Sequence, residues 1–230
     1  MRALRVLREV DLIAAEDTRR TARLLQHYSI VTPTTSLHEH NEHGKAPHLV
    51  ARLQSGTSIA LVSDAGMPLI SDPGALLVRE ARSAGIRVEV VPGPSAVTAA
   101  LAGIGHAGSF TFLGFPPAAG ADRRQWMATV GLLTAETAIV FFEAPHRITR
   151  TLTELLSLLG NKPINVGREL TKVHESLVEK PINAWLEHPS PEKGEFVVVI
   201  PQGQTSADIV ANAVGIPDDA SICAEFGALT

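Results

Sequence analysis

The chain has 230 residues, of which 45% are hydrophobic and 19% charged, so it can bury a sizeable core and does not belong to the disordered class. Its formal net charge of −4 provides no general positive field, which leaves nucleic-acid binding to a local basic patch. The single cysteine excludes a disulfide framework and a zinc finger, and no apolar run approaches the ~20 residues of a membrane helix. We therefore expect a cytoplasmic globular protein with no membrane segment.

Short apolar runs alternate with amphipathic segments over the first hundred residues. The chain begins in helical spacing, and further helices are predicted over 18–27, 47–54, 75–84 and 95–101. Buried strands are predicted over 12–15, 59–62 and 88–91. This alternation predicts an α/β layer with a mainly parallel sheet.

The pattern pauses at a glycine-rich stretch, 103–108, and then resumes. The later segments predict strands over 110–115, 138–142, 164–166 and 196–200, with helices over 122–133 and 148–159. We therefore predict an N-terminal α/β domain over 1–106, a C-terminal α/β domain over 107–202, and a tail of uncertain structure over 203–230.

The strongest functional signal is the loop 63–74, SDAGMPLISDPG, between the predicted strand 59–62 and the next helix. Open α/β sheets bind ligands at the carboxyl ends of their strands, and glycine lets backbone approach a ligand closely. Ser71 or Asp72 is expected to cap the helix, with Pro73 in its first turn. The loop 92–96, PGPSA, repeats this design and would lie beside the first loop if the two strands are neighbours. Neither loop is a Walker or dinucleotide-binding glycine motif, which disfavours phosphoryl transfer and nicotinamide chemistry.

Charged clusters follow other predicted strands. They are EDTRR at 16–20, EAPHR at 143–147 and RELTKVHE at 168–175. Acids and bases at successive strand ends are typical of a cleft, although each cluster is also compatible with helix capping or a solvated loop. The histidines of HEHNEH at 38–43 lack the spacing of a zinc-binding helix and a second ligand group, so we expect no metal site.

Several of these segments together resemble the ribosomal RNA methyltransferases of the tetrapyrrole methylase superfamily, which are class III S-adenosylmethionine-dependent enzymes. The segments are LIAAEDTR (12–19), HEHNE (38–42), SDAGMPLISDPG (63–74), PGPSA (92–96), FEAPHR (142–147) and RELTKVHE (168–175), and the similarity spans about residues 1–200. The resemblance implies two α/β domains with the cofactor cleft between them, and a homodimer. It implies 2′-O-methylation of a cytidine ribose in small-subunit ribosomal RNA, either free or in the assembled subunit.

The sequence departs from the family pattern in three places. Family members open with a strand and a loop resembling Thr-Pro-Ile-Gly-Asn, so the first strand is expected to be missing before the helix at Met1. Residues after about Gly203 do not resemble the basic helical C-terminal region of the family, and position 67, usually Thr in this motif, is Met.

Site residues are carried over from the resemblance. S-adenosylmethionine is expected to contact Asp64, Ala65, Gly66, Pro68, Ser71, Asp72, Pro92, Gly93, Pro94, Ser95 and Ala96. Candidates for the base that accepts the ribose proton are Glu16, Asp17, His38, Glu143, His146 and Glu169. Candidates for RNA phosphate contacts are Arg19, Arg20, Arg147, Arg168 and Lys172. Three other functions stay open: a corrin or tetrapyrrole methylase, a non-catalytic RNA-binding paralogue, and a metal hydrolase built on His38, His40 and His43.

Overall fold

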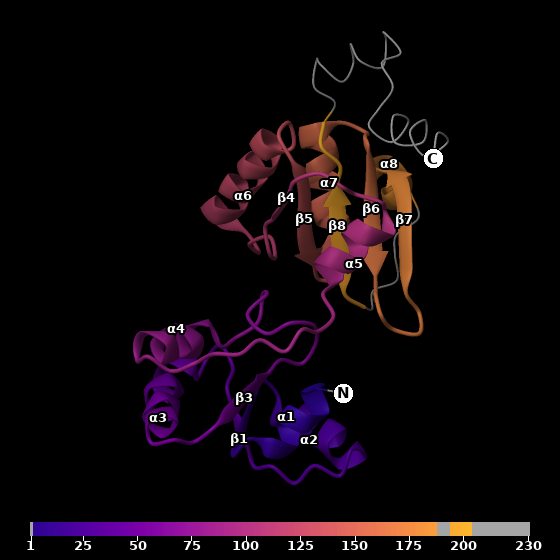
Figure 1. Ribbon diagram of the computed structural model, residues 1–230. Coiled ribbons are helices and arrows are strands. Elements are labelled where there is room, and N and C mark those ends of the chain that lie inside the picture. The colour runs from indigo at the N-terminus through magenta and orange to yellow at the C-terminus, as the bar shows by residue number, and fades with distance from the viewer. Residues whose placement is uncertain (1, 188–193, 204–230) are drawn as a thin grey trace, which may run out of the picture. The chain divides into compact units, whose positions relative to one another are not determined.

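The computed structural model describes residues 2–187 and 194–203 and divides the chain into two compact units, Met1–Ala99 and Ala100–Thr230 (Figure 1). The domain boundary that we predict near residue 106 stays a prediction, as does the tail over 203–230, which lies outside the described residues except for Gly203.

The first unit contains a parallel three-stranded sheet with the order β2-β1-β3. All four residues of the central strand are buried, as expected for a parallel strand covered on both faces. The strands are β1 (Leu12–Ala15), β2 (Thr34–Ser36) and β3 (Ile59–Val62). The helices are α1 (Arg2–Glu9), α2 (Thr18–His27), α3 (Glu42–Gln54), α4 (Ala75–Ser83) and α5 (Ala96–Gly103), the last of which crosses into the second unit.

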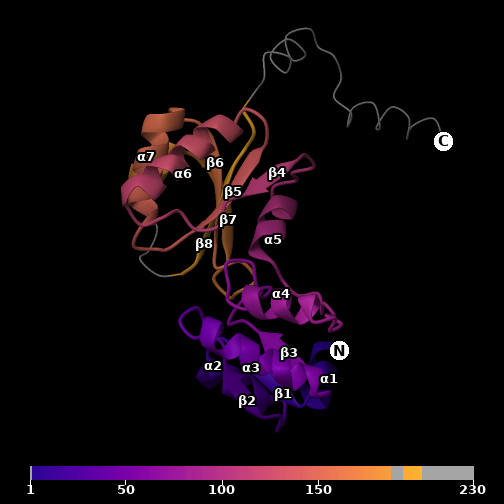
Figure 2. The same ribbon diagram turned by 90° about the vertical axis from the view of Figure 1, so that its left-hand side faces the viewer.

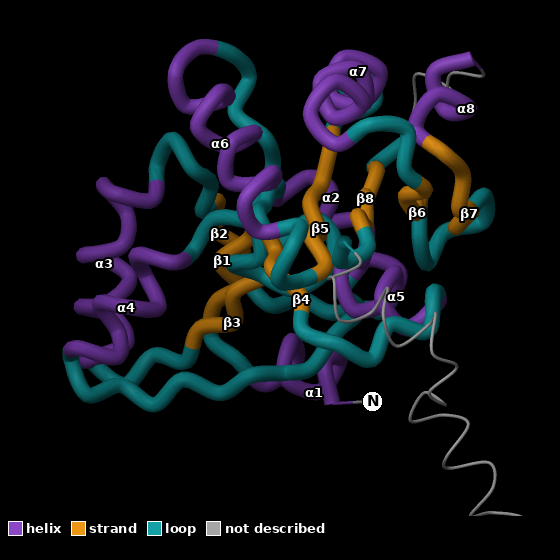
Figure 3. The backbone as a smooth tube through the Cα atoms, turned by 90° about the horizontal axis from the view of Figure 1, so that it is seen from above, coloured by secondary structure: helices purple, strands orange, loops and turns teal. Residues whose placement is uncertain are grey.

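Helices cover both faces of this sheet, because successive side chains of β1 point in opposite directions. Ile13 packs with Leu7 of α1 and Leu25 of α2. Leu12 packs on the other face with Leu49 of α3 and Leu77 of α4, and these two helices lie side by side (Figure 3). The predicted α/β layer is thus present in the first unit.

The second unit is built on a five-stranded sheet with the order β4-β5-β8-β6-β7 (Figure 1). Its strands are β4 (Phe110–Phe112), β5 (Ala138–Glu143), β6 (Pro163–Arg168), β7 (Ser176–Pro181) and β8 (Phe196–Ile200). This sheet is mixed: β4 and β5 are parallel, but the other pairings of the described strands are antiparallel. The reason is that β7 returns beside β6 without a crossover helix, and β8 then inserts between β5 and β6.

The core of the second unit lies between the sheet and three helices, α6 (Gly120–Leu133), α7 (Ile148–Leu159) and α8 (Ile182–Glu187). Phe141 of β5 and Phe196 of β8 are fully buried there with Leu155 of α7. The end of α5 lies over the other face, where a Cβ added to Gly103 would approach Leu177 of β7 to 2.5 Å (Figure 2).

Two predictions about elements are wrong. Residues 88–91 do not form a strand; Val88 and Val90 are 40% and 63% exposed, so the apolar run that predicted a buried strand is not buried. The helix expected to start at Pro47 starts at Glu42, with the proline inside it. None of the helices in the described ranges is long and apolar enough to cross a membrane.

Candidate functional site

Three loops meet at the carboxyl edge of the first sheet, because its strands are parallel. Asp64 joins two of them. Its backbone N–H donates to Glu16 Oε2 at 2.9 Å, its Oδ1 accepts the N–H of Asp17 at 3.3 Å, and its Oδ2 pairs with Arg20 Nη1 at 3.0 Å. The loop after β1 is therefore tied to the loop after β3 through side chains that we predicted as catalytic, cofactor-binding and RNA-binding residues.

The loop 63–74 is held in an unusual backbone conformation. Gly66 and Gly74 have φ values of 72° and 113°, and the non-glycine residues Leu69 and Ser71 have φ values of 73° and 66°. Each non-glycine residue in this region costs about 1–3 kcal/mol, and such strain is concentrated at ligand sites. The glycines of the motif are therefore needed for their conformation, which favours a functional loop over a simple strand–helix turn.

The loop 92–96 lies beside the loop 63–74, although 88–91 is not a strand. The N–H of Gly93 donates to Met67 Sδ at 3.1 Å. A Cβ added to Gly66 would lie 3.7 Å from the carbonyl oxygen of Pro94. The two segments that resemble the cofactor-binding motifs thus form one continuous surface in the first unit.

This surface suits S-adenosylmethionine chemically. The loop 63–74 contains two aspartates and no lysine or arginine, which complements the positive sulfonium and ammonium groups of the cofactor. Leu69 and Ile70 are 36% and 44% exposed and offer apolar surface for an adenine ring. The residues present therefore fit the cofactor.

Asp17 is engaged in capping α2. Its Oδ1 accepts the N–H of Arg19 at 2.8 Å, and its Oδ2 pairs with Arg19 Nη2 at 2.8 Å. The Arg19 side chain and backbone N–H hold the pKa of the Asp17 carboxyl well below its usual range. A carboxylate so stabilised is a weak proton acceptor.

His38 is held in place by Asn41. Asn41 Oδ1 accepts the backbone N–H of His38 at 2.9 Å, and the amide nitrogen of Asn41 lies 2.9 Å from His38 Nε2. The other ring nitrogen, Nδ1, is buried without a partner among the described residues. Nε2 is therefore engaged with Asn41, and Nδ1 is not open to a substrate hydroxyl.

Glu42 has a role that the sequence did not suggest. Its Oε1 accepts the N–H groups of Leu76 at 2.7 Å and Leu77 at 3.3 Å, in the first turn of α4. The expected caps at Ser71 or Asp72 are wrong, because Gly74 occupies the N-cap position and makes no side-chain cap bond. The HEHNE motif thus supports the helix that follows the loop 63–74. The described residues contain no group of three or more His, Cys, Asp or Glu side chains placed to hold a metal ion.

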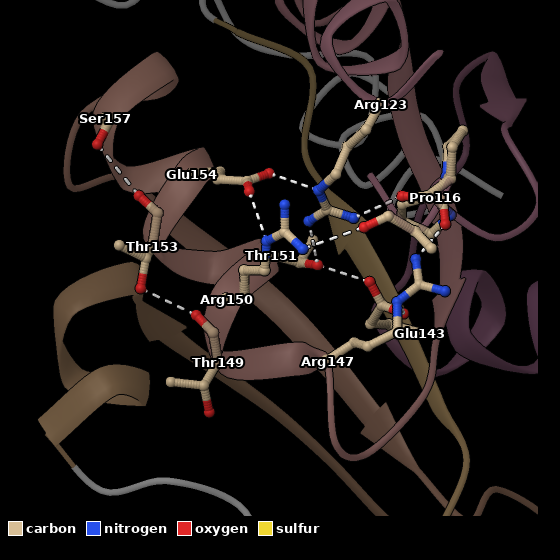
Figure 4. A network of polar contacts seen from close by, with 12 residues as sticks. Pro116, Arg123, Glu143, Arg147, Thr149, Arg150, Thr151, Thr153, Glu154 and Ser157 are labelled. Carbon is tan, nitrogen blue, oxygen red and sulfur yellow. Dashed lines mark hydrogen bonds and ion pairs between the residues drawn. The ribbon is translucent and has the colours of Figure 1, made fainter. Parts of the chain in front are cut away.

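In the second unit, Glu143 is 1% exposed and lies in a polar network (Figure 4). It accepts hydrogen bonds from Thr151 Oγ1 at 2.6 Å and from the N–H of Ala144 at 2.8 Å, and it pairs with Arg147 Nε at 3.2 Å. Arg147 also donates to the carbonyl of Pro116. Both side chains are therefore committed within the unit.

The remaining candidates of the second unit differ sharply in their surroundings. Lys172 Nζ pairs with Glu169 at 2.9 Å and with Glu195 at 3.1 Å, which lowers the pKa of Glu169 and raises the pKa of Lys172. Arg168 also has an interaction partner. His146, by contrast, is exposed and has no hydrogen-bond partner among the described residues.

Residues 1–184 match the family "Tetrapyrrole (Corrin/Porphyrin) Methylases". The chain is 47% identical over 213 residues to a Xylella fastidiosa protein named Ribosomal RNA small subunit methyltransferase I, covering 90% of this chain and 77% of that protein. A protein of the same name from Thermotoga maritima is 44% identical over 87% of this chain and 90% of its own length. The match to the Pseudomonas aeruginosa protein of that name, 49% identical, covers 70% of this chain and 57% of the relative.

Solved structures share the fold at low identity. The methyltransferase CobJ has a TM-score of 0.64 at 16% identity, covering 86% of both chains. A diphthine synthase has a TM-score of 0.65 at 13% identity, covering 91% of this chain and 86% of its own. The cofactor of the family is S-adenosylmethionine. The match to the family model over residues 1–184 shows that the chain belongs to the tetrapyrrole (corrin/porphyrin) methylase family.

Proposed function

We propose that this protein transfers the methyl group of S-adenosylmethionine to the 2′-hydroxyl of a cytidine ribose in small-subunit ribosomal RNA. The observation that carries the proposal is the 47% identity, over 90% of the chain, to a protein named for methylation of this RNA. The neighbour named CobJ is only 16% identical, so a corrin substrate is the less supported alternative. A homodimer acting in the cytoplasm, on free RNA or on the assembled subunit, belongs to the same proposal.

The loops 63–74 and 92–96 hold the cofactor in this proposal. When bound, S-adenosylmethionine supplies an electrophilic methyl group on a sulfonium centre. Asp64 keeps the first loop in position through its contacts with Glu16 and Arg20, and Gly66 and Gly93 bring the two loops together. A rigid surface of this kind lowers the ordering cost of binding and aligns the reacting groups.

His146 is the candidate that the contacts favour as proton acceptor. Glu16 Oε2 accepts the N–H of Asp64, and His38 Nε2 faces the Asn41 amide. Asp17, Glu143 and Glu169 are each held by cationic or N–H donors. The imidazole of His146 has no such commitment among the described residues, and imidazole is the side chain used most often for general-base catalysis.

Arg19 and Arg20 are the strongest of the five candidates for RNA phosphate contacts. Their side chains are 89% and 62% exposed, although each also pairs with a carboxylate. The side chain of Arg147 is only 24% exposed, so its guanidinium is better placed to support the fold than to meet a phosphate. Arg168 and Lys172 stay candidates for phosphate contacts.

The test combines calorimetric titration of S-adenosylmethionine with methyl transfer to small-subunit ribosomal RNA, mapped to the nucleotide. We expect His146→Ala to lower kcat by about 10²–10⁴-fold and to leave cofactor affinity unchanged. The matched control is His174→Ala, which removes another exposed histidine of the second unit. Methyl transfer to a porphyrinoid and not to RNA would support the corrin alternative, and RNA binding without cofactor binding would support a non-catalytic paralogue.

A further inference from the structure

We propose that Phe115 forms a stacking surface for a nucleobase, an inference that rests on the proposed function. Phe115 follows β4 at the carboxyl end of the parallel pair β4–β5, the kind of edge at which α/β sheets bind ligands. Its side chain is 48% exposed, between Gly114 and the buried Pro116. The shared chemistry of the ligand is a flat heteroaromatic ring, which is present in RNA and in the adenine of the cofactor.

The loop that carries Phe115 is fixed by one backbone bond and by three arginines. Gly114, with a φ of 64°, turns the chain, and its carbonyl accepts the N–H of Phe142 at 2.9 Å. Three successive carbonyl oxygens then each accept from a different arginine (Figure 4). The pairs are Pro116 with Arg147, Pro117 with Arg123 Nη1 at 2.9 Å, and Ala118 with Arg150 Nη1 at 3.0 Å.

These arginines are themselves held in place. Arg123 is 3% exposed and donates to Glu154 Oε2 and Thr151 Oγ1, each at 2.8 Å. Thr151 donates in turn to Glu143. Two prolines and a charged network centred on the buried Arg123 and Glu143 thus restrict this loop, so little entropy of loop ordering is lost when a ligand binds it.

Phe115 is also the outer member of a row of aromatic rings. Phe112 meets Phe142 edge-to-face with centroids 4.9 Å apart, and Phe142 lies 5.4 Å from Phe115 at an angle of 54°. One side of the Phe115 ring is therefore supported by protein while about half of the residue stays in solvent. A base that stacks on the free side meets a ring that is already oriented.

The experiment compares Phe115→Ala and Phe115→Trp with Phe110→Ala in the full chain. Phe110 is the matched control because it is 44% exposed at the other end of β4. Two binding measurements, called the cofactor arm and the RNA arm, distinguish whether the stacked ring belongs to the cofactor or to RNA. The cofactor arm is calorimetry with S-adenosylmethionine, and the RNA arm is fluorescence anisotropy with a small-subunit ribosomal RNA fragment. Thermal unfolding of each variant shows that the fold is kept.

We expect Phe115→Ala to weaken binding about 5- to 100-fold in one arm, Phe115→Trp to retain it, and Phe110→Ala to leave both arms unchanged. Loss in the RNA arm identifies an RNA base as the ligand, and loss in the cofactor arm identifies adenine. If the wild type binds and methylates RNA while Phe115→Ala matches Phe110→Ala in both arms, the stacking surface is refuted and the proposed function stands. If the wild type neither binds nor methylates, the proposed function fails and the stacking surface fails with it.

Discussion

Replacing Glu42 with alanine should loosen the start of α4. Glu42 Oε1 accepts the N–H groups of Leu76 at 2.7 Å and Leu77 at 3.3 Å, and Gly74 at the N-cap offers no side chain in its place. A lost N-terminal cap costs about 0.5–2 kcal/mol, and a carboxylate near the helix N-terminus adds about 0.3–1 kcal/mol. We expect the free energy of unfolding of the first unit to fall by about 1–3 kcal/mol.

Amide hydrogen exchange measures this effect locally, and urea denaturation measures it for the whole unit. Exchange at Leu76 and Leu77 should accelerate in Glu42→Ala, and less so in Glu42→Gln, which keeps an acceptor oxygen. Glu39→Ala is the control, because it removes an exposed acid from the same segment. Unchanged exchange at both amides, with an unchanged denaturation midpoint, would refute the claim that Glu42 caps α4.

Two further predictions concern the backbone and the acid limit of stability. Gly74→Ala should lower the free energy of unfolding by about 1–3 kcal/mol, because φ is 113° and the new Cβ would lie 2.5 Å from Leu61 Cδ2. Gly85→Ala is the control, because φ is 76° there but no atom lies within 4 Å of the new Cβ. In thermal unfolding it should lower the melting temperature less than Gly74→Ala does. Lys172 lowers the pKa of Glu169 from its ordinary 4.5, so this contact stabilises the fold above pH 4.5 and is lost as pH falls through the lowered value. An NMR titration should place the Glu169 midpoint below 4.5 and higher in Lys172→Met than in the wild type, whereas equal midpoints would contradict the pairing.

The sequence predicted best those elements whose periodicity is strong and whose burial is complete. The bounds of α2, α7, β1 and β8 agree with the predicted ranges, and all residues of β1 and β8 are buried. In α2, Leu25 is buried as its spacing indicates, but Leu24 is 43% exposed and Thr21 is buried in its place. The polar strand β2, with the sequence TTS, was missed because it lacks alternating apolar side chains. It forms because its backbone pairs with β1, and a pairing of this kind is not visible in local sequence.

In two segments, tertiary contacts override the secondary structure that the local sequence predicts. Val88 and Val90 are typical of a strand, yet among the described residues the segment has no pairing partner, and β propensity depends on packing against neighbours. Pro47 suggests a helix start, but a proline removes only one N–H donor, and α3 extends back to Glu42, whose side chain is engaged with α4.

The sequence suggests acid–base chemistry for the polar clusters at the strand ends. Their contacts in the structure indicate that most of these carboxylates instead fix the backbone of the loops. Glu16, Asp17, Glu42 and Glu143 all accept hydrogen bonds from backbone N–H groups, so each fixes the path of the chain. Methyl transfer from a sulfonium depends above all on alignment and on exclusion of water, and little on strong acids. An enzyme with that task gains more from carboxylates that hold loops rigid than from carboxylates left free. Loop positioning therefore accounts for the number of acidic side chains at the ends of these strands, where the transfer itself requires no strong acid.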